Sequence, residues 1–148
     1  MDSMKVVLPI LISLIVLLAL AGCAQTQQQV GDNTTNSNNG ATGGTEYAIE
    51  YTSEGYAPNK LTIKQGDTVK WVNKSAVEMW PASAKHPTHE VYPSSSITKC
   101  GTSEEAGIFD ACKGIPADGS FSFTFNEVGS WFYHDHIDAK KFGQVIVE

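Results

Sequence analysis

Four histidines, gathered in two close pairs, are the residues of this sequence best suited to chemistry. One pair lies in HPTH, residues 86–89, and the other in WFYHDH, residues 131–136. Neutral imidazole is the commonest protein ligand of metal ions and suits both copper and zinc. A single histidine is more often an ordinary exposed side chain, but two pairs in a chain of 148 residues predict a metal site.

The histidines of the second pair are expected to share one face of a strand. Side chains alternate along a β-strand, so Tyr133 and Asp135 point one way while His134 and His136 point the other. If the aromatic residues fill the core, the two imidazoles face outward, toward whatever the chain lays across them. The first pair lies in a long loop that could provide this cover.

These positions define the expected metal site. The expected ligands are His89, His134 and His136, with His86 as a fourth ligand or as a partner that orients one of them. Asp135 has two alternatives, because a carboxylate that points into the core is costly unless it is hydrogen-bonded or metal-bound. It either accepts backbone N–H bonds at the end of its strand or joins an inward-facing site with Met79, Glu78 and His86. In that site Asp135 and Met79 would be additional ligands or partners of a ligand.

The first two dozen residues predict an export signal rather than a part of the folded protein. Lys5 precedes an apolar run that is too short for a comfortable membrane span of about 20 residues, which predicts a signal peptide over residues 1–22. The run ends in LAGC, residues 20–23, which resembles the lipobox of prokaryotic lipoproteins. Cys23 would then carry lipid and anchor an extracytoplasmic protein to the cell membrane. The alternative is an uncleaved signal anchor with an ordinary cysteine.

The composition of the remaining chain predicts a flexible linker followed by one domain. Residues 23–45 are mostly Gln, Asn, Thr, Ser and Gly with almost no apolar side chain, which predicts a flexible linker behind the lipidated cysteine. Residues 46–148 have the usual size of one small domain. The formal net charge of -6 and the scattered lysines disfavour a nucleic-acid partner, which requires a clustered basic face.

Cys100 and Cys112 lie in the long segment of residues 81–119. In an exported chain a disulfide is the default for two such cysteines, and it would staple a loop of unusual length. Two thiolates that join a metal site are the alternative, although neither cysteine lies in a C-x-x-C motif or beside a histidine.

Strand patterns dominate the domain. SFSFTF, residues 120–125, places three phenylalanines on one face, and Val69, Trp71 and Asn73 alternate in the same way. No stretch has a convincing helical period. Short strands without intervening helices predict an all-β fold, an antiparallel sandwich or barrel.

Two stretches resemble cupredoxins of the plastocyanin and amicyanin type. They are Tyr56-x-Pro58-x-x-Leu61-x-Ile63-x-x-Gly66-Asp67-x-Val69-x-Trp71-x-Asn73, and Gly129-x-Trp131-x-Tyr133-x-Asp135 followed by Gly143-Gln144-Val145-Ile146-Val147. The resemblance covers most of residues 46–148. It implies a Greek-key β-sandwich in which the middle loop, here disulfide-stapled, is much longer than usual.

The positions of the blue-copper ligands depart from that pattern. The family's cysteine, loop histidine, methionine and upstream histidine correspond here to Asp135, Asp138, Lys141 and a position near Met79. Without a thiolate there is no strong copper–sulfur bond to make a blue site, so a blue-copper electron carrier is disfavoured. HPTH and HDH also resemble the H-P-x-H and H-C-H segments of multicopper oxidases with the cysteine replaced, which implies that histidine-bound copper is kept.

Three functional hypotheses follow. The first is a membrane-anchored cupredoxin-like protein that binds copper, or alternatively zinc, through histidines and serves to bind, buffer or deliver the metal. The second is a metal-dependent redox or hydrolytic enzyme, with Asp135, Asp138 or Glu90 as general acid or base. The third is a metal-free module that uses the long loop for protein contacts.

Overall fold

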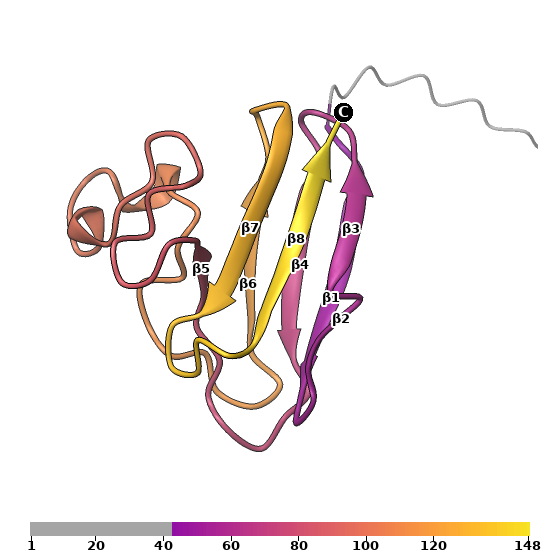
Figure 1. Cartoon of the computed structure of the whole chain (residues 1–148), viewed down its shortest axis with the longest axis vertical. Helices are drawn as coiled ribbons and strands as arrows, with labels where there is room; N and C mark the ends of the chain where they lie inside the picture. Colours follow the sequence, from indigo (N-terminus) through magenta and orange to yellow (C-terminus); the bar gives the residue numbers. More distant parts are fainter. Residues whose placement is uncertain (1–42) are drawn as a thin grey trace, which may run out of the picture. The chain divides into compact units, whose positions relative to one another are not determined.

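Two four-stranded sheets pack face to face in the part of the chain that the structure describes (Figure 1). The structure is a computed structural model that describes residues 43–148, so the predicted signal peptide, Cys23 and the linker as far as residue 42 lie outside the described residues. The first sheet contains, in spatial order, β2 (Gly55–Ala57), β1 (Glu46–Thr52), β4 (Thr68–Asn73) and β6 (Ser120–Thr124). The second contains β3 (Lys60–Ile63), β8 (Phe142–Val147), β7 (Gly129–Asp135) and β5 (Pro81–Ser83).

Alternating side chains build the core as the sequence predicts. Val69, Trp71 and Asn73 of β4 are all fully buried, whereas the residues between them are only partly buried. On β7, Tyr133 and Asp135 point inward and are likewise buried. The predicted all-β sandwich is therefore confirmed, and the period of two in these strands decides which side chains fill it.

The expectation of an antiparallel sandwich is wrong in one respect, because both sheets are mixed. β1 pairs in parallel with β4, and β3 pairs in parallel with β8. Between β1 and β4 the chain forms β2 and then crosses to the other sheet as β3, so it returns beside β1 in the same direction. Alternation specifies the buried face of a strand but not the direction of its neighbour.

A short strand, β5, begins the long segment that the sequence predicts as loop. β5 pairs with β7 on one side, and the isolated bridge between Ala82 and Asp110 extends the pairing on the other. Three residues without alternating polarity give no strand signal, which is why β5 was not predicted. Because of these pairings, His134, Ala82 and Asp110 lie side by side across three neighbouring segments.

Residues 84–112 of the long segment gather at the β5 edge of the sandwich (Figure 1), and residues 115–119 then pass Met79 and Asn73 on the way to β6. It contains two 3-10 helices, η1 (Ile97–Lys99) and η2 (Glu105–Gly107). Its buried Phe109 enters the core and packs 5.1 Å, between ring centroids, from Trp71. The predicted disulfide between Cys100 and Cys112 is present. Over residues 43–148, neither helix is long and apolar enough to cross a membrane.

Removal of the disulfide is expected to destabilise the domain. In Cys100→Ser/Cys112→Ser the free energy of unfolding should fall by roughly 3 kcal/mol, because the crosslink restricts the unfolded chain. Denaturant titration of the oxidised wild-type protein and of the double variant measures this difference. Reduced wild-type protein should match the variant, and equal stability of all three forms would contradict the expectation.

Candidate metal centre

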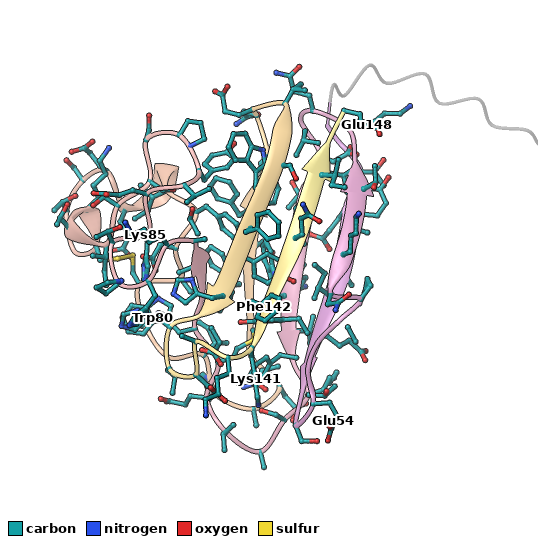
Figure 2. The ribbon with its side chains drawn as sticks, viewed as in Figure 1. Glu54, Trp80, Lys85, Lys141, Phe142 and Glu148 are labelled. Carbon is teal, nitrogen blue, oxygen red and sulfur yellow. A yellow bond between two sulfur atoms is a disulfide. The ribbon has the colours of Figure 1, made fainter. Side chains whose placement is uncertain are left out.

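The end of β7 presents His134 and His136 on the outer side of its sheet. His134 is paired with Ala82 of β5, so the side chains of these two residues lie on the same face of the sheet. The chain then passes beyond the strand, where the backbone N–H of His136 donates to the carbonyl of Trp80 at 2.8 Å. The His136 ring stacks against the Trp80 indole, with 4.5 Å between ring centroids. Figure 2 shows Trp80 at this end of β7.

The segment after β5 brings the other histidine pair over the first. His89 is fully buried, and its φ of 59° is unusual for a residue other than glycine. Such backbone conformations persist only where the surroundings fix them, and they concentrate at functional sites. Its backbone N–H donates to the carbonyl of Lys85 at 2.8 Å, which closes the turn that carries His86 and His89.

All four imidazoles converge. One nitrogen from each of His86, His89, His134 and His136 lies within 4.8 Å of the others. Nε2 of His89 is 2.9 Å from Nδ1 of His136, and Nδ1 of His86 is 3.3 Å from Nε2 of His134. We refer to these four residues as the histidine cluster.

The spacing of the histidine cluster fits a four-coordinate metal ion. Nitrogens bound at about 2.0–2.1 Å to one ion lie about 2.9–3.4 Å apart when they are neighbouring ligands. The two close nitrogen pairs have these separations. The donor set is uncharged and purely nitrogenous, which suits copper or zinc better than magnesium or calcium.

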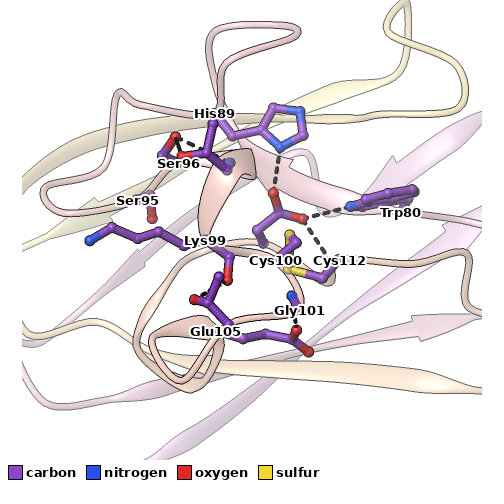
Figure 3. Close-up of a disulfide and its surroundings, with 12 residues drawn as sticks. Trp80, His89, Ser95, Ser96, Lys99, Cys100, Gly101, Glu105 and Cys112 are labelled. Carbon is purple, nitrogen blue, oxygen red and sulfur yellow. Dashed lines mark hydrogen bonds and ion pairs between the residues drawn. A yellow bond between two sulfur atoms is a disulfide. The ribbon is translucent and has the colours of Figure 1, made fainter.

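The buried carboxylate of Asp110 orients the His89 ring of the cluster. Oδ2 of Asp110 lies 2.5 Å from Nδ1 of His89, and both side chains are fully buried. Oδ1 of the same carboxylate accepts bonds from Nε1 of Trp80 at 2.6 Å and from the backbone N–H of Cys112 at 2.8 Å. Figure 3 shows Trp80 and His89 reaching this carboxylate from different segments, beside the disulfide.

The charge state of Asp110 fixes the tautomer of His89. Burial favours the neutral acid, but the hydrogen bonds from His89, Trp80 and the backbone of Cys112 outweigh it and hold the pKa of Asp110 below its ordinary value. An ionised carboxylate can only accept hydrogen bonds, so Nδ1 of His89 carries the proton. Nε2 is thereby left free to bind metal, as in the carboxylate–histidine pairs of metal sites.

Two of the imidazoles are held in the form that binds metal. Burial and then the neighbouring imidazoles lower the pKa of His134 from 6.5 to about 4. The same causes lower the pKa of His136. Metal binding requires neutral imidazole, so these shifts favour ligation at neutral pH.

Asp135 accepts the backbone N–H bonds that the first of its two predicted alternatives expects. Its carboxylate accepts bonds from the Tyr51 hydroxyl at 2.5 Å and from the backbone N–H groups of Trp80 and Ile137, each at 3.0 Å. Met79 lies fully buried in the hydrophobic core. An inward-facing site is not assembled among the described residues, because His86 belongs instead to the histidine cluster. The cluster likewise contains no carboxylate of Glu90 or Asp138.

Two residues that matter to the site were not predicted. Asp110 and Trp80 are separated by 30 positions, and they meet because residues 108–111 lie beside β5. The sequence gives no local signal for this contact, because it depends on the pairing of segments that lie far apart in the chain.

Solved structures share this architecture. A purple cupredoxin from Nitrosopumilus maritimus matches with a TM-score of 0.52 and 19% identity, over 68% of this chain and 98% of its own. Amicyanin from Paracoccus versutus matches with a TM-score of 0.50 and 24% identity, over 73% and 83%. A point mutant of amicyanin in its reduced Cu(I) form at pH 4 matches with a TM-score of 0.50 and 21% identity, over 73% and 85%.

The chain has the cupredoxin fold. No protein-family model matches it, and no curated protein sequence matches it significantly. Within this cupredoxin fold, the positions that the sequence resemblance assigns to blue-copper ligands have other contacts. Asp135 is hydrogen-bonded as described, and the Lys141 ammonium lies 4.7 Å from the centre of the Tyr51 ring. The histidine cluster is instead built between the outer side of β7 and the long loop.

Metal-free protein should lose stability as the pH falls from about 6.5 to about 4. In this window the unfolded chain protonates His134 while the folded protein keeps it neutral, so acid favours unfolding. His134 should contribute a loss on the order of 3 kcal/mol, none of it above the window and all of it below. Denaturant titrations across this range measure it, and His134→Gln should remove this part of the slope. A variant whose pH profile parallels the wild type would show that His134 is not held neutral.

Proposed function

We propose that this protein binds one copper ion between the four imidazoles of the histidine cluster, to bind, buffer or deliver the metal. The observation that carries the proposal is the convergence of four imidazole nitrogens within 4.8 Å of one another. Without a metal, the close nitrogens pair with each other, His89 with His136 and His86 with His134. A shared ion would instead bind one nitrogen of each of the four neutral rings.

Copper is favoured over other metals by the donor set and by the fold. Nitrogen sites bind divalent copper more tightly than zinc or the earlier first-row metals. The structural neighbours include an amicyanin in its Cu(I) form. Zinc is the alternative, because four imidazoles can also surround it tetrahedrally.

Each ligand nitrogen has a defined source. His89 would bind through Nε2, because Asp110 holds its Nδ1 proton. His134 would bind through Nε2, and His86 and His136 through Nδ1. Bound copper would supply an ion that is able to change oxidation state, but no sulfur ligand lies in the histidine cluster. A blue-copper electron carrier is therefore not proposed.

We place this activity on the extracytoplasmic side of a cell membrane. The support comes from the sequence of residues 1–23, which predicts export and lipid attachment at Cys23. The disulfide between Cys100 and Cys112 supports the same location, because such bonds persist in oxidising compartments. A lipid anchor of this kind would keep a copper-binding domain at the membrane surface, beyond the linker.

Copper titration of two variants tests the proposed site. His134→Ala should lower the Cu(II) affinity by at least about 100-fold, because it removes a buried ligand. Asp135→Asn should retain one Cu(II) per chain with nearly the wild-type affinity, because Asp135 has a structural role. Competition with a chelator of known affinity measures both. Loss of copper by Asp135→Asn alone would place the metal in the interior and sink the proposal.

The orienting carboxylate gives a second test. Asp110→Asn should keep the stoichiometry of one ion but weaken Cu(II) binding about 10- to 100-fold, because an amide no longer fixes the His89 tautomer. Asp118→Asn is a matched control, since its carboxylate is exposed and, among residues 43–148, forms an ion pair with Lys74 alone. Equal affinities of the two variants would show that Asp110 has no part in binding.

A further inference from the structure

The four imidazoles of the histidine cluster differ in burial and in their contacts with residues outside the cluster. His89 is fully buried and tied to Asp110. His134 is buried within β7, and His136 is stacked on Trp80. Each of these three rings has a support outside the cluster that fixes its position.

His86 lacks such support. It is the one exposed member of the cluster, and Lys85 and Pro87 on either side of it are exposed as well. Its ring nitrogens form one hydrogen bond within residues 43–148, the 3.3 Å contact of Nδ1 with His134. Its other aromatic contacts are with His89 and His136, whose ring centroids lie 6.4 and 4.9 Å away. Within residues 43–148, the hydrogen bond and the aromatic contacts of this ring are therefore all with other members of the cluster.

We propose that His86 is the exchangeable ligand of the site, through which copper enters and leaves. This inference rests on the proposed function and deepens it toward metal delivery. A lone-pair donor from a metal-accepting protein replaces the His86 imidazole, while His89, His134 and His136 keep the ion. In this first step one copper–nitrogen bond would break as one copper–donor bond forms, and no electron is transferred. Release would be completed as further donors of the acceptor replace the other three imidazoles in turn.

The difference in burial between His86 and the other three histidines explains why exchange would occur at His86. Removing a ring that is locked by packing requires the surroundings to open, whereas an exposed ring on a loop can swing into solvent. An incoming donor reaches the ion only where the ligand shell meets solvent, which is the side of His86. The three supported imidazoles would hold the ion in a defined position during the transfer.

Chemical rescue with free imidazole tests this assignment in the full-length protein. His86→Ala should still bind one Cu(II), with an affinity lowered by no more than about 100-fold, because three fixed ligands remain. Millimolar imidazole should restore its electron paramagnetic resonance spectrum to the four-nitrogen pattern of the wild type. His89→Ala should bind copper far more weakly and should not be rescued, because the position it vacates is buried.

Transfer kinetics give an independent readout. Release of Cu(II) from wild-type protein to EDTA should accelerate with EDTA concentration, as expected when the acceptor attacks the ion. In His86→Ala the transfer should be at least about tenfold faster, because no protein ligand has to be displaced. The exposed neighbour variant Lys85→Ala should behave as wild type in both experiments.

The outcomes separate the two proposals. If wild-type protein binds one copper ion but His86→Ala loses it as completely as His89→Ala, the exchange role is wrong while the copper site stands. The same holds if imidazole leaves the spectrum of His86→Ala unchanged. Wild-type protein that binds no copper overturns both.

Discussion

The hydrogen bond between His89 and Asp110 is the interaction around which this protein is arranged. Both side chains are fully buried. A buried carboxylate is costly unless its oxygens accept hydrogen bonds. Three segments supply the donors, namely the histidine loop, the end of the segment before β5, and the chain at the disulfide. Removing any donor would leave part of the Asp110 charge uncompensated. The hydrogen bond to His89 therefore holds the histidine loop against the β5 edge of the sandwich.

Packing within the β-sandwich fixes the position of Asp110 beneath the histidine loop. Phe109 is buried against Trp71, so its neighbour Asp110 has little freedom to move. Ala82 lies between Asp110 and His134, because it pairs with His134 on one side and with Asp110 on the other. At the inner mouth of the sandwich, Asp135 ties Tyr51 to the backbone beside the histidines. The proposed metal site thus lies outside the hydrophobic core, which stabilises the fold.

Local periodicity explains what the sequence could predict. The alternation through residues 131–136 correctly placed Tyr133 and Asp135 inside and directed His134 to the other face. The disulfide followed from two cysteines in a chain that the sequence predicts to be exported. The alternation depends on neighbours in the sequence, and the disulfide depends on the two cysteines of the predicted domain.

Features that depend on tertiary pairing could not be predicted. Asp110 and Trp80 meet only because residues 108–111 pair with β5, which is too short to leave a pattern. The parallel pairing of β1 with β4 follows from the path of the chain between the sheets. The turn that brings His86 and His89 over β7 depends on an unusual backbone conformation at His89, for which the residue type gives no signal.

The most direct measurement of the central claim is a crystal structure of the protein loaded with Cu(II), with anomalous diffraction collected at the copper edge. We expect one anomalous peak per chain, at about 2.0–2.1 Å from a nitrogen of each of His89, His134 and His136, with His86 as the fourth ligand. A peak beside Asp135 and Tyr51, or separate peaks at the two histidine pairs, would contradict it.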